Sequence, residues 1–196
     1  MNSEFDEIIH NRRSIYPYQF EKGKIIPDEI IWQLLENANR APTHKLTEPW
    51  RFTVFSGDGL QYFANKQSQI YKEFAGEKFK ESKLKKLMEY PLLSSHVIVV
   101  SMKRALEIKI PEVEEIIATG CAVENIYLSV AAHGLACYFS TGGITYFEQA
   151  KSFLHLQADD HLIGFFYLGY PGDIKNPLSW RNPVAEKVTW IRSAEL

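Results

Sequence analysis

The sequence predicts an α+β fold in which helices outnumber strands. About four short runs of apolar or β-branched residues have the length and composition of strands, and longer amphipathic or charged segments separate them. The hydrophobic fraction of 45% is sufficient for a core. The length of 196 residues suits one ordinary domain, or one subunit of an intertwined dimer. We therefore expect residues 1–196 to form a single domain.

The composition argues against several classes of protein. The net charge of −2 gives no sign of a nucleic-acid partner or of a membrane-surface partner. The N-terminus lacks the apolar core of a signal peptide, and no apolar run reaches membrane-spanning length, so we expect a cytoplasmic protein. Cys121 and Cys137 lie in apolar surroundings and form no C-x-x-C pair, which predicts core thiols in a reducing compartment.

The first predicted helix can be capped by Ser3 and ends before two consecutive arginines. Acidic residues in its first turn suit the positive end of the helix dipole. Arg12, Arg13 and Ser14 follow the helix. The arginines can complement the negative end of the dipole, or they can form an anion clamp, because a guanidinium group matches two phosphate oxygens at once. The residues alone leave these two interpretations equally open.

A polar loop joins the second predicted helix to the first predicted strand. This helix begins at Pro27 and ends near Arg40, because Pro42 cannot continue it. Before the strand at residues 51–56 the loop carries a dense set of polar side chains: Thr43, His44, Lys45, Thr47 and Glu48. A solvated connection and a ligand-binding loop are equally good interpretations, since loops on rigid scaffolds often carry function.

Residues 60–89 are predicted to be helical, with lysine and glutamate at helical spacing, which is typical of a solvated face. The G-x-G at residues 57–59 lacks the third glycine of a dinucleotide-binding motif, so we interpret it as a turn. The histidines and aspartates at residues 155–161 are irregularly spaced, and no metal site is predicted there.

The second half of the chain alternates buried strands with helices. Residues 96–102 form a continuous β-branched run that predicts a central strand. The helix predicted from residue 112 to about 133 is small and apolar almost all round, so it must be buried on several sides, in a core or between subunits. Short strands are predicted at residues 134–141 and 161–169, with a helix at 146–154 between them.

Four motifs, in order from about Ile8 to Val188, carry a resemblance to a known family. They are "RRSIYPYQF", "RAPTHKLTEPWRF", the long helix ending "LSVAAHG", and "LGYPGD". Together they resemble the nitroreductase family of FMN-dependent enzymes, and the second is closest to the small YdjA-like branch. Glu48 departs from the family pattern, which usually has glutamine at this position.

The resemblance implies an architecture and a cofactor site. The implied fold is nitroreductase-like: a mixed, mostly antiparallel central sheet flanked by helices, in an intertwined homodimer with FMN sites at the subunit interface. Residues matching the FMN phosphate and ribityl contacts are Arg12, Arg13, Ser14 and Arg181. The loop at the flavin ring matches Phe139, Ser140, Thr141 and Gly142. The polar loop, contributed in part by the partner subunit, matches Arg40, Thr43, His44 and Lys45.

The resemblance also implies an activity. With FMN bound, NADH or NADPH would reduce nitroaromatics, quinones or similar flat electron-poor acceptors by a ping-pong mechanism, and no side chain needs to act as a nucleophile. The alternative is a flavin-binding storage, sensing or partner-binding protein without turnover. Steady-state oxidation of NAD(P)H distinguishes the two, because a pure binding protein shows none.

Overall fold

The computed structural model describes residues 3–107, 109–173 and 177–192. Its helices are α1 (Glu4–Asn11), α2 (Asp28–Ala38), α3 (Asp58–Phe74), α4 (Glu81–Leu92), α5 (Glu112–Ala132) and α6 (Glu148–Phe153). Its strands are β1 (Trp50–Ser56), β2 (His96–Met102), β3 (Ala136–Ser140) and β4 (His161–Gly169). The α+β class is therefore confirmed, and outside residues 60–89 the predicted helices and strands are found with their ends shifted by a few residues.

The four strands form one sheet in the order β1-β2-β4-β3. Each of the three pairings is antiparallel, so within the described residues the expected mixed sheet is instead entirely antiparallel. The predicted central strand β2 is buried along its whole length, as its β-branched run requires. The strands β1 and β3 form the two edges. The amide of Ile15 donates to the carbonyl of Cys137 at 2.9 Å, which brings the segment after α1 alongside β3.

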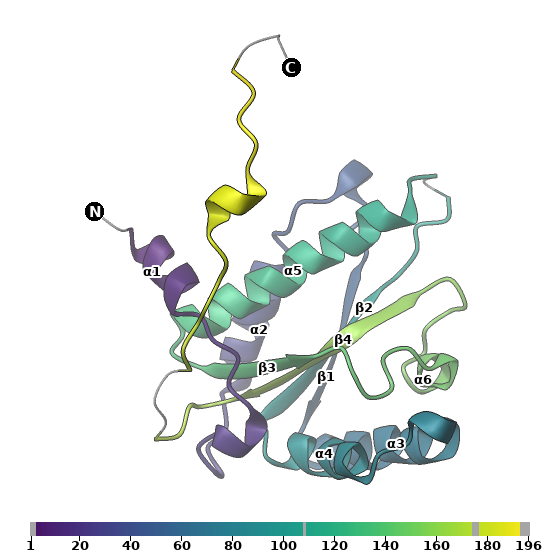
Figure 1. Ribbon diagram of the computed structural model, residues 1–196. Helices are drawn as coiled ribbons and strands as arrows, with labels where there is room; N and C mark the ends of the chain where they lie inside the picture. The colour runs from purple at the N-terminus through teal and green to yellow at the C-terminus, as the bar shows by residue number, and fades with distance from the viewer. Residues whose placement is uncertain (1–2, 108, 174–176, 193–196) are drawn as a thin grey trace.

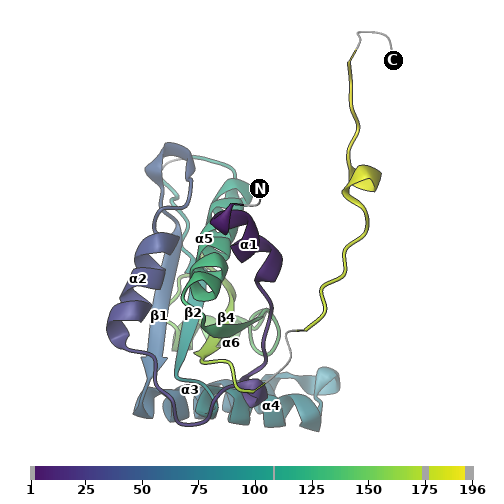
Figure 2. The same cartoon turned by 90° about the vertical axis from the view of Figure 1, so that its left-hand side faces the viewer.

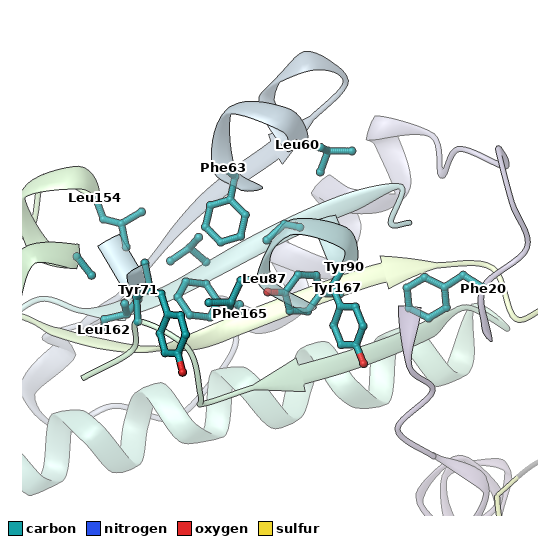
Figure 3. Close-up of a cluster of buried hydrophobic side chains, with 14 of the residues drawn as sticks. Phe20, Leu60, Phe63, Tyr71, Leu87, Tyr90, Leu154, Leu162, Phe165 and Tyr167 are labelled. Atoms are coloured by element: carbon teal, nitrogen blue, oxygen red, sulfur yellow. The ribbon is translucent and has the colours of Figure 1, made fainter. Parts of the chain in front are cut away.

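Helices cover both faces of the sheet, because its central strands are apolar on both sides. Figure 1 shows α5 crossing one face with α2 beside it, and α3 and α4 beneath the other. The turned view in Figure 2 shows the same three layers. Ile98 and Phe166 point toward α2 and α5, whereas their neighbours Val99 and Phe165 point toward α3, α4 and α6. Figure 3 shows the aromatic cluster on this second face.

The charged segment predicted as one helix over residues 60–89 is two helices, so that expectation was wrong. Gly76 adopts a left-handed conformation with φ of +51° and ends the first helix, a role that glycine serves without a steric penalty. The buried Tyr71 holds the connection, because its hydroxyl donates to the Lys78 carbonyl at 3.1 Å and accepts from the Lys80 amide at 3.0 Å. The mixed charge pattern continues across the break and therefore conceals it.

The long helix α5 has one face on the sheet and one face exposed. Ala122 and Ile126 are fully buried against the sheet, whereas Ile117 is 60% exposed. Among the described residues, α5 is also the one helix long and apolar enough to cross a membrane by length and composition, although we expected no such run. Only 33% of its apolar stretch is buried, so burial on several sides would require a further partner.

The two ends of the chain also carry exposed apolar side chains. Phe5 and Ile9 on α1 are 58% and 45% exposed. Figures 1 and 2 show the C-terminal segment running away from the sheet and its helices. In this segment Leu178, Trp180 and Trp190 are almost entirely exposed. Exposed large apolar side chains are therefore found near both ends of the chain as well as on α5.

Candidate functional site

Arg12 lies at the end of α1, beside the middle of α5. The start of α1 is fixed by a capping box in which Ser3 and Asp6 exchange hydrogen bonds, and Arg12 follows its last residue. The Arg12 guanidinium carbon lies 4.9 Å from the centre of the Tyr127 ring. A cation over the face of an aromatic ring is attracted by the ring's quadrupole. Within the residues that the structure describes, the half-buried Arg12 side chain makes no hydrogen bond or ion pair, so its donors are free.

Arg13 is engaged differently from its neighbour. Its Nε donates to the Pro177 carbonyl at 2.9 Å, and one terminal nitrogen donates to the carbonyls of His10 and Arg12 at 2.6 and 2.8 Å. This is the dipole-complementing role at the end of a helix that the sequence left open. Arg13 thus ties the end of α1 to the start of the C-terminal segment, and Arg12 is the arginine with free donors.

Tyr127 joins the arginine to the edge strand. Burial raises its pKa to about 12, although contacts with Ser14 and the charge of Arg12 act in the opposite direction. Its ring packs edge-on against Phe139 of β3, with centroids 6.1 Å apart. The structure therefore brings Arg12, Ser14 and Phe139 together around one neutral tyrosine. A groove of about 480 Å³ opens beside Arg12, Arg13 and Tyr127.

The loop after β3 lines a second hollow of about 360 Å³. Ser140, Thr141 and Gly142 form one wall of it. Thr145 fixes this loop by donating its hydroxyl to the Gly142 carbonyl at 2.7 Å. Gly143 has φ of +68°, and a β-carbon there would lie 2.8 Å from a methyl carbon of Leu87. The leucine methyl can move aside, so the positive φ is the main reason that this position favours glycine.

A row of tyrosines lies on the opposite side of β3 from Tyr127. Tyr16, from the segment after α1, packs against Tyr138 with ring centroids 4.6 Å apart. Tyr138 in turn meets Tyr90 of α4 edge-on at 6.1 Å and stacks with Tyr167 of β4 at 6.2 Å. Three of these rings, Tyr90, Tyr138 and Tyr167, line the 360 Å³ hollow. The edge strand thus has the groove that contains Arg12 on one side and an aromatic hollow on the other.

The polar loop between α2 and β1 is held in an unusual backbone conformation. Lys45, Leu46 and Glu48 have φ of 51°, 54° and 42°, which is the left-handed region that residues other than glycine rarely adopt. The Thr43 hydroxyl accepts a hydrogen bond from the Glu48 amide at 3.2 Å, and His44 pairs with Glu114 of α5. Such strain is frequently retained at functional sites.

This loop and the Arg12 cluster lie at different places along α5. His44 contacts Glu114 and Arg12 contacts Tyr127. At a rise of 1.5 Å per residue these positions are about 20 Å apart along the helix. Arg181 lies in the exposed C-terminal segment, where it donates to the Trp180 carbonyl at 2.8 Å. One chain therefore brings together only part of the predicted site. The residues that lie along β3 are Arg12, Ser14, Phe139, Ser140, Thr141 and Gly142. The residues that lie elsewhere are Arg40, Thr43, His44, Lys45 and Arg181.

Sequence reasoning missed the tyrosines of this region. In the sequence Tyr127 lies within a helix of small and apolar residues. A single phenol among such residues is the signal that could have marked it as a site residue. Tyr16, Tyr90 and Tyr138 come from three separate segments, and nothing in the sequence shows that they meet. A larger groove of about 530 Å³ between α2 and β1 contains none of the predicted site residues. Its size therefore does not make it the candidate site.

The sequence also matches a known protein family. The sequence model described as the nitroreductase family matches residues 9–170. The chain belongs to the nitroreductase family. The matched range includes Arg12, the polar loop and the glycine loop after β3, and stops before the C-terminal segment. The part of this nitroreductase-family chain that the family model matches is therefore the sheet and the helices that cover it.

Two curated relatives are YdjA of Escherichia coli strain K12 and YfhC of Bacillus subtilis, both named as candidate NAD(P)H nitroreductases. YdjA is 28% identical over 144 residues, which are 73% of this nitroreductase-family chain and 76% of YdjA. YfhC is 25% identical over 193 residues, 96% of this chain and 94% of YfhC.

Solved structures of the family share the fold. A nitroreductase-like protein from Bacillus cereus superposes with a TM-score of 0.79 at 24% identity, covering 98% of each chain. A Desulfovibrio desulfuricans nitroreductase homologue, solved in complex with FMN, gives a TM-score of 0.71 at 22% identity and covers 98% of this chain and 99% of that one. These likenesses confirm the nitroreductase-like fold that the sequence motifs implied.

Proposed function

We propose that this chain is an FMN-dependent oxidoreductase that uses NADH or NADPH to reduce flat, electron-poor acceptors such as quinones and nitroaromatics. Membership of the nitroreductase family supports the enzyme class. The names of YdjA and YfhC support NAD(P)H as the reductant, and the FMN in the Desulfovibrio desulfuricans structure supports the cofactor.

The observation that carries the proposal is the arrangement along the edge strand β3. Arg12 supplies free donors beside a groove, and these suit a phosphate dianion, since guanidinium–phosphate hydrogen bonds are charge-assisted. Ser14 and Ser140 supply hydroxyls that suit the ribityl chain or the ring edge. The backbone at Gly142, on one wall of the 360 Å³ hollow, suits the edge of a flat ring. This donor set therefore fits the phosphate, polyhydroxyl and ring parts of FMN.

The protein's own residues bind and orient rather than react. When bound, FMN would supply hydride acceptance from NAD(P)H and electron transfer to the acceptor. Arg12 would neutralise the phosphate, and Tyr90, Tyr138 and Tyr167 would line the space beside the ring that NAD(P)H and the acceptor use. We assign no nucleophile and no general acid among the side chains. NAD(P)H and the acceptor use the same place in turn, which gives ping-pong kinetics.

A second copy of the chain completes the site in this proposal. Exposed apolar side chains on α1, on the outer face of α5 and in the C-terminal segment all require cover, for example Phe5, Ile117 and Trp180. An intertwined homodimer would cover them together. It would also allow the polar loop with Arg40, Thr43, His44 and Lys45 to reach the partner's flavin ring, where the positive charge of Arg40, His44 and Lys45 would favour the reduced form. Arg181 would reach the phosphate.

Steady-state kinetics tests the proposed activity. NADH and NADPH oxidation would be measured with 1,4-naphthoquinone or nitrobenzene while both substrates are varied. The proposal predicts turnover and parallel lines in double-reciprocal plots. FMN binding without any oxidation of either nucleotide would favour the alternative, a flavin-binding storage or sensing protein. Intersecting lines would contradict the ping-pong order while leaving the enzyme class intact.

A further inference from the structure

We propose that Lys83 and Lys86 of α4 form an anion subsite, and that this oxidoreductase therefore prefers acceptors whose aromatic ring carries a carboxylate or sulfonate. The inference rests on the proposed function, because that function places the acceptor beside the Ser140–Gly142 loop. It goes further by assigning the substrate class and the residues that select it.

The two lysines and the glycine loop face one another across the 360 Å³ hollow. Lys83 and Lys86 lie one helical turn apart and both line it from the α4 side, while Ser140 to Gly143 line it from the β3 side. The Lys83 ammonium would lie 3.9 Å from a β-carbon added at Gly142, so it sits at the loop itself. It also lies 5.4 Å from the centre of the Tyr71 ring, which holds the half-buried side chain in place.

The charge of this hollow is positive and unbalanced. Its lining contains the two lysines and no carboxylate. Over the described residues, neither Lys83 nor Lys86 forms an ion pair, whereas Lys85 on the same helix lies 3.8 Å from Glu89. Two like charges one turn apart repel each other, and an anion bound between them removes that repulsion.

The remaining walls suit an aromatic ring. Tyr90, Tyr138 and Tyr167 line the hollow, and burial raises the pKa of each phenol above its ordinary value. They are therefore neutral near pH 7 and add no negative charge to oppose an anion. Figure 3 shows Leu87, Tyr90 and Tyr167 close together in the same cluster. A flat ring can stack here with its anionic substituent toward α4.

Two kinds of ligand could bring an anion to these lysines. One is an acidic acceptor, and the other is NADH or NADPH, whose phosphates are also anions attached to an aromatic system. Both would place an anion at the lysines, and only the acceptor assignment predicts selectivity among acceptors. Matched variants separate them. The test variant is Lys83→Gln with Lys86→Gln, and the control is Lys85→Gln, which removes one lysine of the same helix outside the hollow.

Equilibrium binding gives a readout that does not depend on activity. Isothermal titration calorimetry would compare naphthalene-2-sulfonate with the neutral 2-naphthalenemethanol on the purified protein, with and without added FMN. We expect the double variant to lose at least about tenfold in affinity for the sulfonate and less than about twofold for the alcohol. The control variant should match wild type. Equal affinity of wild type and double variant for the sulfonate would overturn the subsite.

Rapid kinetics then assigns the anion to the acceptor or to the nucleotide. Protein reduced with one equivalent of NADH would be mixed with 1,4-naphthoquinone-2-sulfonate or with 1,4-naphthoquinone. We expect the double variant to slow reoxidation by the sulfonate at least about fivefold more than reoxidation by the neutral quinone. If only reduction by NADH slows, the lysines serve the nucleotide and the acceptor assignment is wrong. Absence of FMN binding and of all turnover would instead contradict the proposed function, and the calorimetry still tests the subsite on the purified protein.

Discussion

The Arg12 guanidinium carbon lies 4.9 Å above the Tyr127 ring, whereas the adjacent Arg13 donates three hydrogen bonds to backbone carbonyls. Two neighbouring arginines that look alike in the sequence thus have different tasks. Tyr127 orients Arg12 without using its N–H donors, because a cation–π contact involves the face of the group. Arg12 is therefore the residue that we assign to the FMN phosphate, with Arg13 as a positioning residue.

Arg12→Ala should raise the dissociation constant for FMN about 10- to 100-fold, because hydrogen bonds to a charged group contribute about 1.5–3 kcal/mol. The measurement is fluorescence titration of apoprotein with FMN. Arg13→Ala should also weaken FMN retention, by loosening the turn that carries Arg12. Arg51→Ala, on the opposite edge of the sheet, is the matched control and should bind FMN normally. An Arg12→Ala protein with unchanged affinity would remove the phosphate assignment.

Two isoleucines on α5 separate the interior of one chain from the proposed dimer interface. Ile126 is fully buried and Ile117 is 60% exposed. Ile126→Ala should lower the free energy of unfolding by about 2–5 kcal/mol, through lost apolar contact and a residual cavity. Ile117→Asp should instead shift the sedimentation coefficient toward that of a monomer while the far-ultraviolet circular dichroism spectrum is retained. A dimer of unchanged dissociation constant in Ile117→Asp would place the subunit interface elsewhere.

The start of α5 contains a buried ion pair between Glu115 and Arg104. The Glu115 side chain is 0% exposed and also accepts a hydrogen bond from the Ala105 amide at 2.9 Å. Arg104→Ala leaves that carboxylate buried without its charge partner, so we expect a loss of about 3–5 kcal/mol in the free energy of unfolding. The double variant Arg104→Met with Glu115→Gln should regain most of it, because the amide keeps the Ala105 bond without a charge. Urea denaturation of both proteins measures the free energy of unfolding. If the double variant recovers no stability, the buried unpaired charge is not the cause of the loss in Arg104→Ala.

Stability should fall at alkaline pH. Burial raises the pKa of the Cys137 thiol to about 12 and that of Tyr127 to about 12, from ordinary values of 9.0 and 10.0. The unfolded chain therefore loses these protons first. The stabilisation is fully present below about pH 9 and is lost as the pH rises toward 12, at up to about 1.4 kcal/mol per pH unit for the thiol. Urea denaturation between pH 8 and 11 should show a shallower decline in Cys137→Ala with Tyr127→Phe than in wild type. Equal slopes would contradict this origin.

Local patterns predicted the elements of this fold well. The strand at residues 161–169 and the helix from Glu112 are found where their apolar patterns place them. The break at Gly76 was missed because mixed charge continues across it, and charge periodicity carries no information about a turn. The mixed sheet came from the family resemblance, whereas the described strands pair only in the antiparallel sense.

The candidate site was harder to predict, because its parts meet only through tertiary packing. The motif around Arg12 to Ser14 indicated an anion site, but not that Arg13 would be occupied by carbonyls. Tyr16 and Tyr138 meet because Ile15 pairs with Cys137 across the sheet edge, and no local pattern encodes that pairing. In the sequence Lys83 is one of many lysines on a solvated helical face, and only the structure places the loop at Gly142 opposite it.

The visible absorbance spectrum of the purified protein tests the central claim most directly. The account predicts a flavin spectrum, with FMN identified by mass after release at about one per chain, and bleaching of that spectrum when NADH or NADPH is added without oxygen. A colourless protein that excess FMN does not colour would contradict the account. In that case the edge strand β3 with Arg12, the tyrosine row and the glycine loop would have to serve another ligand.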